Sequence, residues 1–348
     1  MERSSGVVGR VARKGSLFLT ATIAAAMSAP SLQAQSDVTA FVDGAGDLWI
    51  VGDGKNASIR LRSTDNEDEF TVTTWPGFGP TTTVNGLALV TLFAPGRRFV
   101  LVLNGGNTTA GIGVDYGSDN SCCSRDLAVI GGSGNEILYV LGPGFRVNAD
   151  LGAGNDQVLI SEGASGIQSS FLNMGEGNDV IDLDSFVGVT DSTFQMGPGN
   201  DLFDLGWSGW VENTLVEMSP RTGTTLPDDD QVVGRGGGPF ELRTGVGNDT
   251  VDIFDGWPSK IETGPGSDFV RLSGDLNGSD SDGLPLEILL QHGDDRLEVS
   301  FLDVPTARFD GGPGTDTYRD LGDNVFGTPP EVISFELPYP KATRGVIR

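Results

Sequence analysis

Two neighbouring stretches decide the fold of this chain: NMGEGNDVIDL at residues 173–183 and QMGPGNDLFDL at residues 195–205. Each has alternating apolar residues, then a G-x-G-N-D turn, then a second alternating run. Eight further copies recur elsewhere, three of them weaker and one degenerate, and the starts of all ten lie 19 to 28 residues apart. Counted at the first turn residue, the copies start at Asn104, Gly132, Gly152, Gly175, Gly197, Ser219, Gly245, Gly264, Gln291 and Gly312. This spacing is typical of solenoids and other repeat arrays.

Each copy has an apolar side and a polar side. Positions −3 and −1 before the turn and +6 and +8 after it are mostly apolar, whereas the residues between them are mostly polar. Strict alternation predicts strands with one buried face, and parallel stacking of successive copies would bury a continuous core. The sequence therefore predicts an all-β parallel β-helix of about ten coils, roughly 45–50 Å long at ~4.8 Å per coil. Position −3 should form one internal column of Leu172, Phe194, Val216, Leu242, Ile261 and Ile288.

The segments outside the repeat have their own expected roles. Residues 1–34 combine a basic start, a short apolar run and small residues, which predicts a signal peptide and a secreted or cell-surface protein. Residues 36–98 read as short strands of an N-terminal β cap, residues 99–325 as the β-helix, and residues 326–348 as a C-terminal cap and tail. Within the β-helix, residues 222–239 are expected to be a loop that replaces a regular strand.

Composition excludes several classes of partner. The formal net charge of −26 repels nucleic acid and anionic lipid and attracts cations. No apolar run after the leader is long enough for a membrane helix. Cys122 and Cys123 are adjacent, so they could pair only as a strained vicinal disulfide within one chain.

The turn carries the residues that could take part in ligand binding or other chemistry. Its glycines suit a tight turn with positive φ, and stacked Asn side chains at position +3 could hydrogen-bond along a column. Position +4 is acidic in eight of the ten copies. Carboxylates stacked about 5 Å apart repel one another by roughly 1 kcal/mol in water. Either each carboxylate caps amides of its own turn, or hard cations between coils neutralise the column.

The motifs LGAGNDQVL, MGEGNDVID and TGVGNDTVD resemble the hemolysin-type (RTX) calcium-binding nonapeptide, G-G-x-G-x-D-x-U-x. The resemblance implies Ca²⁺ between successive turns. This chain departs from the family pattern in two ways. The nonapeptides of that family run back to back, whereas the copies here are separated by other residues. The first Gly of the motif is also replaced in most copies. The implied calcium ligands are Glu136, Asp156, Asp179, Asp201, Asp249, Asp268, Asp295 and Asp316, with a break in the column at Ser219.

Two classes of function follow. The first is a secreted, acidic, calcium-binding repeat protein with a structural, surface or adhesive role, whose partners would be calcium ions and cell-surface or matrix components. The second is a carbohydrate-active β-helix enzyme, a polysaccharide lyase or glycoside hydrolase. The acid pairs Asp229/Asp230 and Asp294/Asp295 and the single histidine, His292, are its only visible candidates. Adjacent strand residues point in opposite directions, which favours the non-enzymatic interpretation.

Overall fold

The computed structural model describes residues 36–336 except 65, 67, 76–81, 97, 114–124, 142–144, 162–165, 184–187, 220–227 and 275–284, and gives no side-chain burial for 207–210. The expected signal peptide, Cys122 and Cys123, and residues 337–348 lie outside the described part. The described residues form strands and turns without a helix, so the all-β expectation is confirmed. They accordingly include no helix long and apolar enough to cross a membrane.

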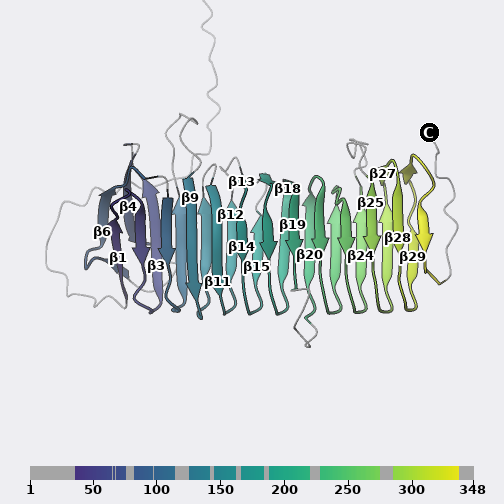
Figure 1. Ribbon diagram of the computed structural model, residues 1–348, viewed down its shortest axis with the longest axis horizontal. Helices are drawn as coiled ribbons and strands as arrows, with labels where there is room; N and C mark the ends of the chain where they lie inside the picture. Colours follow the sequence, from purple (N-terminus) through teal and green to yellow (C-terminus); the bar gives the residue numbers. More distant parts are fainter. Residues whose placement is uncertain are drawn as a thin grey trace, which may run out of the picture. The chain divides into compact units, whose positions relative to one another are not determined.

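Most strands belong to two long parallel ladders joined by the repeated turn (Figure 1). We call them the pre-turn ladder and the post-turn ladder, and one strand of each plus the turn between them is a unit. The pre-turn ladder consists of β2 (Leu48–Val51), β7 (Arg98–Val102), β9 (Arg125–Gly132), β11 (Phe145–Gly152), β14 (Phe171–Asn173), β17 (Thr193–Gln195), β19 (Thr214–Glu217), β21 (Phe240–Arg243), β23 (Lys260–Glu262), β25 (Leu286–Leu289), β28 (Ala307–Asp310) and β31 (Glu331–Ile333).

The post-turn ladder is parallel throughout as well. Its strands are β3 (Ala57–Ser63), β8 (Thr108–Gly113), β10 (Ile137–Leu141), β12 (Gln157–Ser161), β15 (Val180–Leu183), β18 (Leu202–Glu212), β20 (Gln231–Gly236), β22 (Thr250–Phe254), β24 (Phe269–Ser273), β26 (Arg296–Ser300) and β29 (Thr317–Asp320). Each pre-turn strand except β31, the last described strand, leads through its turn into the matching post-turn strand. The turns therefore stack at one edge of the described fold (Figure 1).

The parallel pairing starts earlier in the chain than residue 99. Strands β2 and β3 form a complete unit on β7 and β8, with residues 52–56 (GDGKN) as its turn. The antiparallel part is smaller: β4 (Glu69–Thr74) pairs with β3 and β6 (Leu89–Phe93), and β1 (Ser36–Val42) pairs with β2. Strand β1 also runs parallel to β5 (Thr82–Val84). These strands are the observed content of the expected N-terminal cap.

Short strands mark the opposite edge, where the connections vary. Strands β13 (Ile167–Gln168) and β16 (Gly188–Thr190) pair with each other, and β16 also pairs with the last residues of β18. Nearer the C-terminus, β27 (Asp303–Val304) pairs with β30 (Val325–Phe326). Apart from the unit of Ser219, the turn edge is thus the regular edge, and the connection edge takes up the other differences in unit length.

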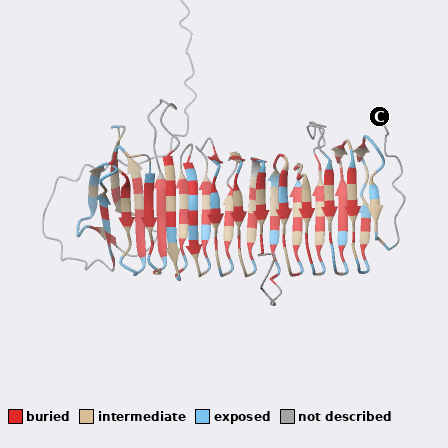
Figure 2. Ribbon diagram, viewed as in Figure 1, coloured by how far each residue is buried: buried red, intermediate tan, exposed pale blue. Residues whose placement is uncertain are grey.

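The core lies between the two ladders, where buried positions alternate along each strand (Figure 2). The predicted −3 column is confirmed: its six members are in register and fully buried. Phe194, for example, lies between Leu172 and Val216 and meets Phe203 of the facing ladder edge-on at 5.2 Å.

The expectation for residues 222–239 is corrected. The segment contains β20, which is in register with β18 on one side and β22 on the other. Val232 fills the buried position between Phe203 and Val251. The regular post-turn strand is therefore present and is only displaced along the sequence, because extra residues enter the turn after Ser219.

Candidate metal centre

The turn glycines allow units to stack at very close range. In Gly177 and Gly199 φ is +152° and +144°, a region that L side chains rarely adopt. A Cβ on Gly199 would lie 1.5 Å from the carbonyl oxygen of Gly177 in the preceding unit. The glycines are needed for both backbone conformation and close approach.

This close approach gives a prediction. Gly199→Ala should destabilise the fold by about 3 kcal/mol or more, because the clash adds to the strain of positive φ. Gly322→Ala is the matched control: its φ is +103°, but a Cβ there meets nothing within 4 Å. The control should lose only about 1–2 kcal/mol. Urea unfolding of both variants checks this, and equal losses would mean that close approach contributes nothing.

Two ladders of side-chain hydrogen bonds connect neighbouring units. In one ladder the side chain accepts an amide of the next unit, and in the other it accepts an amide of the preceding unit. At position +3, Oδ1 of Asn155 accepts the backbone N–H of Asn178 in the next unit at 2.9 Å. At position +4, Oδ1 of Asp179 accepts the backbone N–H of Asp156 in the preceding unit at 2.7 Å. The Asn ladder is exposed and the acid ladder is buried. Where both ladders are present, as between these two units, the junction is held by a reciprocal pair of hydrogen bonds.

The acidic residues of position +4 form one continuous file, which we call the acid column. All eight residues expected from the sequence are in it, and each is at most 2 % exposed. The expected break at Ser219 is wrong, because Asp230 fills it: Asp230 accepts the amide of Asp201 and donates its own amide to Asp249. The acid column is Glu136, Asp156, Asp179, Asp201, Asp230, Asp249, Asp268, Asp295 and Asp316.

Burial raises the pKa of these carboxyl groups, because water no longer solvates the charged form. The neighbouring carboxylate along the column adds to the effect in most of them. The pKa is raised to about 6 in Asp249, about 7 in Asp179, Asp268 and Asp295, about 8 in Glu136 and Asp201, about 9 in Asp230, and in direction also in Asp156 and Asp316.

The regular part of the acid column does not match the ligand set of calcium, which takes six to eight oxygens. One oxygen of each Asp accepts an amide, and the other is buried without a hydrogen-bond partner. In the last unit a Cβ at position −1 would lie 2.7 Å from Oδ2 of Asp316, so that position borders the carboxylate. Leu or Met occupies it in most other units. Within the described chain, no three acidic, His or Cys side chains converge on one metal position.

Comparison with known proteins adds no information about these residues. No family model, curated protein or solved structure matches this chain. The aspartates of the G-x-G-N-D turns face the interior and accept backbone amides. This differs from the alternative in which each carboxylate caps its own turn, since each Asp accepts the amide of the neighbouring unit.

One unit departs from the regular arrangement. In the unit of Ser219, position +2 is Asp228 in place of glycine, so two carboxyl groups of one unit point inward. The Ser219 hydroxyl lies 2.7 Å from Oδ2 of Asp228 and 3.1 Å from Oδ2 of Asp230. We call Ser219, Asp201, Asp228, Asp230 and Asp249 the Ser219 nest. Neither Asp228 nor Asp230 was foreseen as part of the site.

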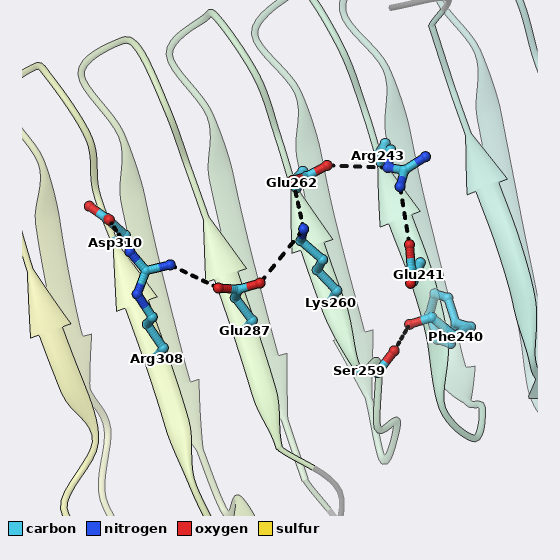
Figure 3. Close-up of polar contacts among 9 residues, drawn as sticks. All are labelled: Phe240, Glu241, Arg243, Ser259, Lys260, Glu262, Glu287, Arg308 and Asp310. Carbon is cyan, nitrogen blue, oxygen red and sulfur yellow. Dashed lines mark hydrogen bonds and ion pairs between the residues drawn. The ribbon is translucent and has the colours of Figure 1, made fainter.

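The outer face of the pre-turn ladder carries a network of opposite charges near the C-terminus (Figure 3). Arg243 contacts Glu217 at 3.0 Å and Glu262 at 3.2 Å, and Lys260 contacts Glu262 at 2.8 Å and Glu287 at 3.6 Å. These pairs join consecutive strands across the ladder. Because they are partly exposed, each contributes modestly, and their main effect is to neutralise charge on this face.

The residues considered for an enzyme are divided between the surface and the interior. Asp229 and Asp294 are exposed whereas their neighbours in the acid column are buried, and His292 is an exposed turn residue. A separate polar groove of about 660 Å³ crosses the starts of β17, β19 and β21. Its lining includes Asp191 and Glu241.

Proposed function

We propose that this chain is a parallel β-helix that acts as a secreted or cell-surface scaffold, with a structural or adhesive role. The observation that carries the proposal is the pair of opposed ladders at the turn edge. Among the described contacts, the acid ladder joins every pair of neighbouring units from Glu136 to Asp316, and the position +3 ladder joins all of these pairs except the one between Ser267 and Asp294. Such a stack is stabilised mainly by nearest-neighbour contacts, and its length is set by the number of units.

The distribution of charge supports a passive surface. The formal net charge of −26 favours solubility and keeps copies of the chain apart. The basic side chains of the C-terminal outer face are largely engaged with acids, as for Arg308 with Glu287 and Asp310, both at 2.8 Å. The acid column adds rigidity from inside. In this proposal the regular column needs no calcium.

Small-angle X-ray scattering of the purified protein tests the proposed β-helix. Eleven units at a rise of about 4.8 Å give a rod of roughly 50 Å, before the segments at either end are counted. Removal of calcium with a chelator should leave the scattering curve unchanged. A compact, near-spherical particle would refute the β-helix, and a rod that collapses in chelator would show that calcium holds the regular column together.

The groove favours a second candidate, a carbohydrate-binding or carbohydrate-active site. Carboxylates, an amide and hydroxyls side by side suit the hydroxyl groups of a saccharide. Asn213 donates to Asp191 at 3.1 Å, and Glu241 pairs with Arg243 at 3.2 Å, so much of the lining is already engaged. Screening of the protein on a glycan array, with Asp191→Asn as the control variant, tests this candidate. If the protein binds a glycan and the Asp191→Asn variant does not, a carbohydrate site would become the preferred function.

A further inference from the structure

The Ser219 nest gathers four buried carboxyl groups without an ion-paired base. Its four carboxyl groups are at most 3 % exposed, and no described Lys, Arg or His forms a salt bridge with any of them. Asp228 acts electrostatically on Asp201, Asp230 and Asp249. Like charges in such a setting repel strongly and require a compensating positive charge.

The hydrogen bonds of the nest point to the same requirement. The hydroxyl of Ser219 has one proton, yet it lies within hydrogen-bonding distance of two carboxyl oxygens, one from Asp228 and one from Asp230. The other oxygen of Asp228, Oδ1, is buried with no partner, and so are Oδ2 of Asp201 and Oδ2 of Asp249. Buried polar atoms without partners are rare and call for a ligand or a proton.

We propose that the Ser219 nest is a single internal site for a hard divalent cation of the calcium class. The donor set is both oxygens of Asp228, Oδ2 of Asp230 and the Ser219 hydroxyl, completed by the free oxygens of Asp201 and Asp249. These six oxygens meet the lower end of the coordination number of Ca²⁺. Because no three acids converge as they stand, binding requires Asp201 or Asp249 to rotate toward Asp228.

The nest differs from the regular column in a way that can be tested. In the other units from Asp156 to Asp316, each unit contributes one inward carboxylate, and one of its oxygens is committed to an amide. Asp228 accepts no backbone amide among the described contacts, so both of its oxygens can turn to an ion. The proposal does not depend on the scaffold role, since an ion at one unit and the length of the rod are measured separately.

Calorimetric titration of the chelator-treated protein with CaCl₂ at pH 7.5 tests the site. We expect one ion per chain and a melting temperature that rises with Ca²⁺ and much less with Mg²⁺, which demands octahedral geometry and keeps its water. Asp228→Asn should weaken binding at least tenfold, and Ser219→Ala should weaken it less. Asp156→Asn, in the regular column, should leave affinity and stoichiometry unchanged.

Three results would overturn the proposal. Several ions per chain, with fewer after Asp156→Asn, would place calcium along the regular column instead. The absence of any heat or melting shift at millimolar Ca²⁺ would show that protons neutralise the nest. Binding that survives both Asp228→Asn and Ser219→Ala, in variants that keep the circular dichroism of the parent, would place the ion elsewhere.

Discussion

Phe194→Asp should abolish the native fold. The side chain is fully buried at the middle of the −3 column and contacts Phe203 of the facing ladder. Loss of the ring alone costs about 3–5 kcal/mol, and a buried carboxylate without a partner adds several more. The sum exceeds or matches the whole stability of an ordinary domain, about 5–15 kcal/mol. Circular dichroism and limited proteolysis of the purified variant would measure the loss.

Two control variants separate burial from chemistry. Phe194→Leu keeps the position apolar and should lose only about 1–2 kcal/mol. Thr193→Asp places the same carboxylate on the neighbouring, outward side of the strand, where the change should be less than about 1 kcal/mol. If Phe194→Asp retained a cooperative melt near that of Thr193→Asp, the inside and outside of the ladders would be assigned wrongly.

The melting temperature should be highest near pH 4–5 and fall steadily toward pH 9. Burial raises the pKa of Asp179 and Asp268 to about 7, and that of Glu136 to about 8. A rise from about 4 to about 7 corresponds to about 4 kcal/mol per carboxyl group. Because the folded state binds these protons more tightly, their contribution is complete below the unfolded pKa. It is lost as the pH rises through the folded pKa values.

The double variant Asp179→Asn, Asp268→Asn should flatten this pH dependence. An amide keeps the oxygen that accepts the neighbouring N–H but cannot ionise, so the variant should melt higher than the parent at pH 8–9. Asp150→Asn, on the exposed outer face, is the matched control and should change little. Scans in 0.5 M salt would screen surface repulsion and leave the buried contribution. A parent protein that becomes more stable from pH 5 to pH 9 would contradict the prediction.

The core could be predicted because the alternation of side chains leaves a direct trace in the sequence. Leu172, Phe194 and Val216 share a fixed offset from their turns, and parallel stacking in register follows from that offset. The N-terminal unit of β2 and β3 was not recognised, because its strands were interpreted as part of the N-terminal cap over residues 36–98. The handedness of the stack has no comparable signature in the sequence.

The sequence identified eight residues of the acid column but gave no prediction of which way their carboxylates point. Asp179 is two residues before Ile181 and four before Leu183, so the alternation already puts it on the buried side. Attention to that parity could have shown that the carboxylates point inward. Asp230 was missed because a fixed spacing from Ser219 predicts position 223. The pair Asp230 and Val232 repeats the pattern of Asp179 and Ile181, and this signal does not depend on spacing.

The reciprocal hydrogen bonds at the turn have a consequence for how such a chain can change in evolution. Removal or duplication of one whole period, for example the 22 residues from Gly175 to Met196, again brings an Asn side chain to the amide of an Asn and an Asp side chain to the amide of an Asp. The junction created is chemically the same as the junction lost. The number of units can therefore change by one whole period at a time without creating a new kind of interface between units. The length of the stack can thus be adjusted in equal steps.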